Sequence, residues 1–169
     1  MRTIIFILTI LILFGCDEDK SILIAGNGTS EYPIGQIKVK DLVKRLGDDY
    51  KFTQGITDGY DWAEYTNRYI YPNGITFIAY VLEEPNMNED TALIDCLVFD
   101  SPLQNHTKTK KGIEIGFSTP TDVIEAYGNV YKMREDSGMQ IFHYGPQGIS
   151  IEFNKETNTV SSIRIYKSY

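Results

Sequence analysis

The sequence predicts an α+β protein of two tandem repeats, each a short helix followed by a three-stranded antiparallel meander. Residues 40–51 align without gaps on residues 121–132, sharing Asp, Gly, Tyr and Lys at equivalent positions. Two further pairs of segments match in the same order, 72–77 with 146–151 and 94–99 with 160–165. Three ordered matches indicate an internal repeat, which outweighs any single motif in the chain.

The first segment, residues 1–15, has the pattern of a signal peptide. Arg2 precedes an apolar stretch of about a dozen residues, too short for a bilayer that requires roughly 20. The run Leu13-Phe14-Gly15-Cys16 resembles the lipobox of bacterial lipoproteins. That resemblance implies acyl chains, palmitate among them, on Cys16, and a lipid-anchored location in the bacterial cell envelope. The outer membrane is the favoured location, with the protein either facing the periplasm or exposed at the cell surface. The alternative is an ordinary secretory signal with an incidental cysteine.

Residues 16–32 are expected to form a flexible tether. Asp17-Glu18-Asp19 directly follows the lipid site, and a charge run of this kind is usually a solvated spacer. The cluster also resembles the surface-export signal of Bacteroidota lipoproteins, whereas an Asp in the second position resembles an inner-membrane retention signal of enterobacteria. The sequence leaves this choice open. Random-coil scaling gives such a tether a reach on the order of 20 Å.

Each predicted repeat begins with a helix. In repeat 1, residues 33–100, an apolar stripe at i, i+3, i+4 and i+7 consists of Val39, Leu42, Val43 and Leu46. Residues 101–112 form a polar linker. In repeat 2, residues 113–169, Thr119 is a good N-cap, Pro120 suits the first helical position and Asp122 completes a capping box. Gly47 and Gly128 stand where each helix needs a terminator.

Antiparallel strands are expected after each helix. Pro72-Asn73-Gly74 and Pro146-Gln147-Gly148 are turn sequences between alternating apolar runs, so each predicts a hairpin. Second turns, within 86–90 and 155–158, lead to the last strand of each repeat. The segment from Phe52 to Glu64 is compatible with an extra helical turn or a loop.

The second repeat resembles small envelope lipoproteins of the BamE/SmpA type and the tandem-repeat β-lactamase inhibitor proteins that share their fold. The resemblance rests on the run from Ile115 to Gly128, with Tyr144, Gly148-Ile149 and the segment 160–163 downstream. It covers the first repeat more loosely. It implies a non-enzymatic protein that binds other proteins, and it names no partner.

Composition and motifs argue against several classes of function. A net charge of −7 gives no basic footprint for nucleic acid. Cys96 lies in an apolar strand rather than at an activated position, and no Gly-x-Ser-x-Gly motif occurs. His106 and His143 are too far apart in sequence to suggest a zinc site. We therefore expect no enzyme, no cofactor and no metal site.

Two groups of residues are candidates for binding a partner. The aromatic cluster around Tyr60 and Trp62 can stack on sugars or anchor a protein interface, although strand packing is the more common role of such residues. The second group comes from the repeat register, which places apolar side chains on the open face of the first sheet: Thr76, Ile78, Tyr80, Cys96 and Val98. Exposed apolar faces usually mark interaction sites, with Ile78, Tyr80 and Val98 as the expected anchors. Alternatively, residues 22–24 or 101–112 cover this face.

These features together predict a lipid-anchored, non-catalytic envelope protein that acts as a protein–protein interaction module. One alternative is a glycan-binding accessory lipoprotein that uses Tyr60 and Trp62. Another is an inhibitor or immunity-type lipoprotein that caps an enzyme.

Overall fold

Antiparallel strands dominate the computed structural model, which describes residues 22–58, 63–81, 91–100, 107–136 and 138–168. The strands are β1 (Ile22–Leu23), β2 (Lys51–Asp58), β3 (Ala63–Ile70), β4 (Ile75–Val81), β5 (Cys96–Phe99), β6 (Lys108–Thr109), β7 (Lys132–Asp136), β8 (Met139–Tyr144), β9 (Ile149–Asn154) and β10 (Thr159–Tyr166). The helices are α1 (Val39–Leu46), α2 (Pro120–Tyr127) and the short 3₁₀ turn η2 (Gly145–Gln147).

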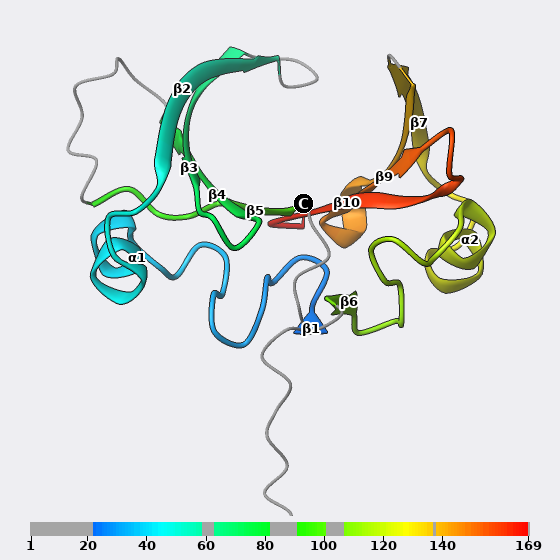
Figure 1. Ribbon diagram of the computed structural model, residues 1–169, viewed down its shortest axis with the longest axis horizontal. Helices are drawn as coiled ribbons and strands as arrows, with labels where there is room; N and C mark the ends of the chain where they lie inside the picture. Colours follow the sequence, from blue (N-terminus) through cyan, green and yellow to red (C-terminus); the bar gives the residue numbers. More distant parts are fainter. Residues whose placement is uncertain (1–21, 59–62, 82–90, 101–106, 137, 169) are drawn as a thin grey trace, which may run out of the picture.

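A single eight-stranded antiparallel sheet, in the order β2-β3-β4-β5-β10-β9-β8-β7, contains all the long strands. The predicted α+β class of two helix-plus-three-stranded repeats is therefore wrong, because the described chain is mostly β and has only two short α-helices. The sheet is joined at its centre, where β5 pairs with β10 through Phe99↔Ile163 and Leu97↔Ile165. It curves strongly, so that both helices lie on its convex side and its opposite side is concave (Figure 1).

The prediction missed the strands at the two edges of the sheet, β2 and β7. The helix-or-loop segment after Phe52 in fact begins with β2, which pairs with β3 from Lys51↔Ile70 to Asp58↔Ala63. Strand β7, with the sequence KMRED, is exposed along its whole length. An edge strand that is solvated on both faces lacks apolar alternation, and charged residues there protect the edge from pairing with other chains. The hydrophobic pattern therefore carries little signal for either strand.

The helices and their caps are confirmed. In α2, the Thr119 side chain accepts from the Asp122 N–H, and Asp122 accepts from the Thr119 N–H at 2.7 Å, which completes the capping box. The two helices end at Gly47 and Gly128, whose φ angles are 85° and 90°. Among the described residues, no helix has the length and apolar character needed to cross a membrane.

The N-terminal segment belongs to the folded body from Ile22 onward, so the flexible tether predicted over residues 16–32 is too long. Strand β1 pairs in parallel with β6 through Ile22↔Lys108 and Leu23↔Thr109. Leu23 is fully buried, and Tyr32 packs edge-on against Phe77 with ring centroids 5.1 Å apart. The composition of this segment suggested a flexible chain, but Leu23 and Tyr32 are apolar enough to anchor it.

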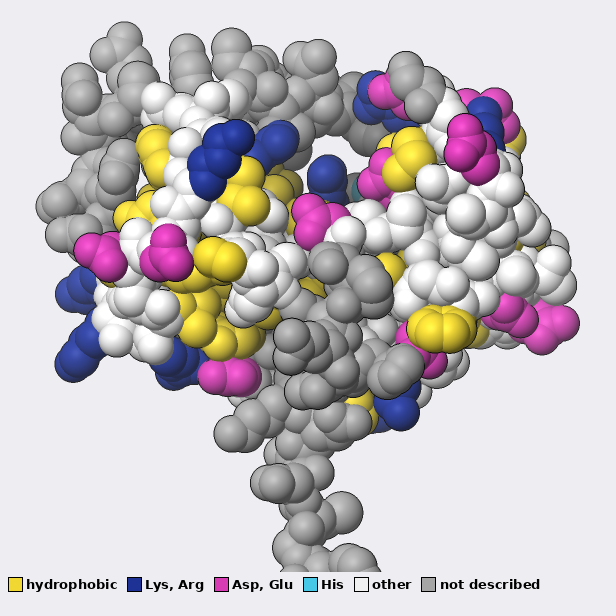
Figure 2. Space-filling view, in the orientation of Figure 1, with side chains coloured by type: hydrophobic (Ala, Val, Ile, Leu, Met, Phe, Trp, Pro, Cys, Tyr) yellow, Lys and Arg dark blue, Asp and Glu magenta, His cyan; other side chains and the backbone are white. Residues whose placement is uncertain are grey.

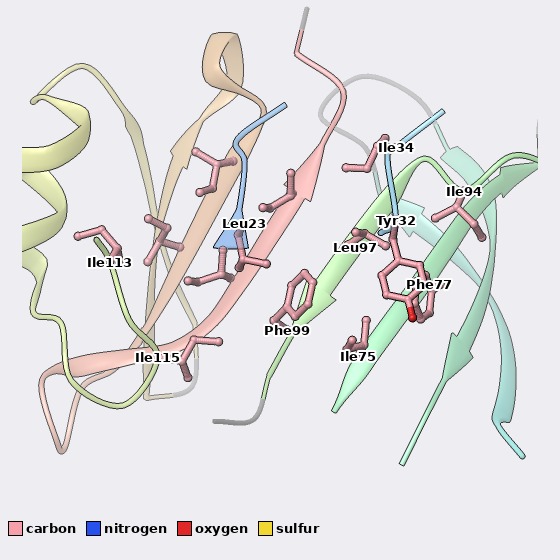
Figure 3. Packing of buried hydrophobic residues seen from close by; sticks show 14 of the residues in the cluster. Leu23, Tyr32, Ile34, Ile75, Phe77, Ile94, Leu97, Phe99, Ile113 and Ile115 are labelled. Atoms are coloured by element: carbon pink, nitrogen blue, oxygen red, sulfur yellow. The ribbon is translucent and has the colours of Figure 1, made fainter. Parts of the chain in front are cut away.

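One hydrophobic core fills the space between the convex side of the sheet and the segments that cover it. Figure 3 shows Leu23, Tyr32 and Ile34 from the N-terminal segment and Ile113 and Ile115 from the segment before α2, around Phe99 and Leu97 of β5. Alternating residues of β9 and β10 belong to this core, since five of them are at most 1% exposed: Ile149, Ile151, Phe153, Ile163 and Ile165. Both halves of the sheet therefore depend on the same core.

Candidate functional site

The hollow side of the sheet, here called the concave face, is the surface on which the predicted binding residues lie. Neighbouring strands are in register, so one row of side chains crosses all eight of them: Lys51, Ile70, Thr76, Val98, Arg164, Ser150, His143 and Lys132. We call this the central row. Paired residues of an antiparallel sheet share a face, so the whole row points into the hollow. Figure 2 shows this hollow open between the two arms of the sheet, with charged side chains at its floor.

A second row lies beside the central row and contains Thr53, Arg68, Ile78, Cys96 and Tyr166. Tyr80 lies two residues after Ile78 on β4, so it belongs to the same face of the sheet. Its N–H donates to Asp95 Oδ2 at 3.1 Å, which fixes the end of β4 beside the start of β5. The structure thus brings Ile78, Tyr80, Cys96 and Val98 onto one face, as the register predicted.

The prediction that this apolar group is exposed is wrong for two of its residues, Ile78 and Cys96. Ile78 is 4% exposed and Cys96 is fully buried, whereas Tyr80 and Val98 are half-buried. Side chains on the hollow side of a strongly curved sheet converge, so short ones at its centre are covered by longer neighbours. Burial raises the pKa of the Cys96 thiol to about 12, although Arg164, Arg68 and Tyr80 act in the opposite direction. A thiol of this kind is inert, so Tyr80 and Val98 remain as candidate contact residues.

Segments proposed to cover the concave face do not all lie there. Ile22 and Leu23 are on the convex side, paired with β6 and packed into the core. Residues 101–106 of the predicted linker are outside the described residues, as are Cys16, Tyr60, Trp62 and His106. The neighbouring tyrosines Tyr69 and Tyr71 are 2% and 5% exposed and belong to the core.

A hydrogen-bonded group of His143, Ser150 and Tyr166 forms one side of the hollow. Tyr166 Oη donates to the Ile149 carbonyl at 3.0 Å, so it accepts from Ser150 Oγ at 3.3 Å. His143 Nδ1 lies 2.8 Å from Ser150 Oγ and 3.1 Å from Tyr166 Oη, so it is hydrogen-bonded to both hydroxyl groups. The rings of His143 and Tyr166 are stacked, with centroids 5.4 Å apart.

This group links three neighbouring strands, because His143 lies on β8, Ser150 on β9 and Tyr166 on β10. Burial lowers the pKa of His143 below its usual range, and the charges of Lys132 and Arg164 lower it further. The neutral ring therefore stiffens the floor of the hollow and presents its flat surface together with Tyr166.

Basic side chains line the concave face although the whole chain is acidic. The cations are Lys51, Arg68, Lys132, Arg134 and Arg164, and all but Arg68 are exposed. Fewer acidic residues belong to this face by strand register in the described part of the chain, namely Glu64, Glu152 and Asp136. Against a net charge of −7, the hollow is thus a local region of positive potential.

The repeat alignment already pairs the two lysines at the ends of the central row, but the sequence-based prediction did not place them on this face. Lys51 and Lys132 are the identical lysines of the two aligned helix segments, and each opens the edge strand of its half. Because β2 and β7 were not recognised as strands, the two lysines could not be placed on the same face as Arg164.

Outside the concave face, the described residues form few arrangements that could bind a metal ion or a small ligand. Groups of His, Cys, Asp and Glu able to hold a metal ion are absent from the described residues. Two shallow depressions of about 470 and 500 Å³ lie beside α2 and α1 on the convex side. Asp122 in the first has a lowered pKa because its carboxylate accepts from Thr119, which is a capping role rather than a catalytic one.

Comparison of the chain with protein-family models, curated proteins and solved structures found no match. The concave face therefore has to be interpreted from its own residues.

Proposed function

We propose that this protein is a lipid-anchored, non-catalytic interaction module of the bacterial cell envelope, which binds another protein on its concave face. The observation that carries the proposal is the central row, a continuous strip of charged, aliphatic and aromatic side chains across eight paired strands. Half-buried Val98 and Tyr80 supply apolar contact area, and the charged residues around them supply specificity.

The position of the proposed anchor supports this role. Only five residues of sequence stand between Cys16 and Ile22, so the two are at most about 20 Å apart. Strand β1 lies on the convex side of the sheet, beside β6 (Figure 1). An acylated Cys16 would hold the convex side towards the lipid, so that the concave face points away from the membrane and is open to a partner.

The anchor makes a direct prediction about lipid labelling. The chain has two cysteines, so Cys16→Ala and Cys96→Ala form a matched pair. In bacteria fed an alkyne-tagged palmitate, we expect the wild type and Cys96→Ala to be labelled and Cys16→Ala to fall to background. Labelled Cys16→Ala, or an unlabelled wild type, would contradict the anchor.

Binding on the concave face is tested by a pair of valine substitutions. Val98 is half-buried in the central row, whereas Val130 is 86% exposed between α2 and β7. In quantitative cross-linked capture from native membranes, Val98→Glu should reduce the recovery of the main partner at least about tenfold, because a carboxylate opposite Arg164 replaces apolar contact area and neutralises the guanidinium. Val130→Glu should recover the partner as the wild type does.

One outcome of this capture experiment would contradict binding on the concave face. Equal recovery by Val98→Glu and the wild type, with both proteins folded by circular dichroism, would remove the concave face as the binding surface.

A further inference from the structure

We propose that the partner presents an acidic segment to the concave face, one that also carries aliphatic or aromatic side chains. This inference rests on the proposed function and adds the chemistry of the ligand. It starts from the contrast between a chain of net charge −7 and a hollow in which the basic side chains of the described residues outnumber the acidic ones.

The cations are spread along the hollow rather than gathered at one point. Lys51 and Lys132 lie at the two ends of the central row, on the edge strands, and Arg164 lies on β10 near its middle. With neighbouring strands about 4.8 Å apart, the seven intervals of the row measure roughly 34 Å along the curved sheet. A strip of that length suits an extended or helical segment with several carboxylates better than a small anion.

Arg68 adds a second guanidinium in the neighbouring row. Its Nε atom is buried and has no hydrogen-bond partner among the described residues. Rotation of this side chain towards the hollow would offer the N–H to a carboxylate, the group that guanidinium pairs with most strongly. Arg68 and Arg164 both lie close enough to Cys96 to affect its thiol, so they flank the same central site.

The uncharged residues between the cations favour a protein over a polyphosphate. Half-buried Val98, Ile70 and Tyr80 offer apolar contacts, and the stacked pair His143–Tyr166 offers an aromatic surface. Glu152 and Asp136 in the same hollow would repel an evenly charged phosphate backbone, whereas a protein segment can place neutral or basic residues against them. An acidic, partly apolar segment matches every kind of residue in the row.

The inference is tested by selecting random 12-residue peptides from a display library on the full chain, held in detergent micelles. We expect the enriched peptides to be acidic and to contain an aliphatic or aromatic residue. Their affinity should fall at least about tenfold for the double variant Arg164→Glu/Lys132→Glu and should weaken as salt is raised. The matched control Lys40→Glu/Lys44→Glu, on exposed positions of α1, makes the same charge change on the convex side and should bind as the wild type does.

Two contrary outcomes separate the inference from the proposed function. If the enriched peptides are neutral or basic and bind Val98→Glu more weakly than the wild type, the proposal of an acidic partner is wrong. The concave face would remain the docking surface in that case. Peptides whose affinity is unchanged by both Val98→Glu and the Arg164/Lys132 variant would overturn the docking surface itself, and the inference with it.

Discussion

Replacement of Gly148 by alanine is expected to lower the free energy of unfolding by about 3 to 5 kcal/mol. Gly148 has φ = 68° after η2, and a Cβ there would overlap the carbonyl oxygen of Tyr166 and lie 2.6 Å from Gly26 Cα. The Gly148 carbonyl also accepts from the N–H groups of Gly26 and Tyr166 at 3.2 and 3.1 Å. The substitution would therefore push both the N-terminal segment and the end of β10 away from the start of β9.

Gly138 provides the matched control. Its φ is 89°, but no atom of the described residues lies within 4 Å of the position that a Cβ would take, so Gly138→Ala should cost only the conformational term, about 1 kcal/mol. Urea denaturation followed by circular dichroism measures both variants. Equal losses at the two positions would contradict the close packing of the N-terminal segment on Gly148.

Truncation of Phe99 to alanine is expected to destabilise the whole protein by about 3 to 5 kcal/mol. Phe99 is 2% exposed on β5 and pairs with Ile75 of β4 and Ile163 of β10, so it contacts both halves of the sheet. Because the two halves share one core, the loss should appear as a shift of a single cooperative transition.

The control for this substitution is Phe117→Ala, since Phe117 is 63% exposed. We expect it to change stability by less than about 1 kcal/mol. Two separate transitions in Phe99→Ala, one of them at the wild-type midpoint, would mean that the halves fold independently and would contradict a shared core.

The parts of the fold that could be predicted from the sequence are those that side-chain chemistry encodes locally. The stripe of α1, the Thr119–Asp122 capping box and the alternating core residues of β9 and β10 are all visible in the sequence, and the structure confirms them. The edge strands were missed because residues such as those of β7 are solvated on both faces. The pairing of β5 with β10 was missed because apolar periodicity does not specify which strands become neighbours.

The candidate site was predictable only in part for a similar reason. Alternation placed Ile78, Tyr80, Cys96 and Val98 on one face, and the structure agrees. Alternation does not encode curvature, however, so it could not show that Ile78 and Cys96 are buried at the centre of a hollow. The cationic lining was hidden because it is assembled from strands that are distant in sequence.

The central claim, that a partner protein docks on the concave face, is tested most directly by site-specific photo-cross-linking in living cells. A benzophenone amino acid at position 53, a half-buried site on β2 in the row beside the central row, should capture one dominant partner. The same group at position 130, outside the sheet, should capture none above background. Capture of the same protein from position 130 but not from 53 would contradict docking on the concave face and place the binding surface elsewhere.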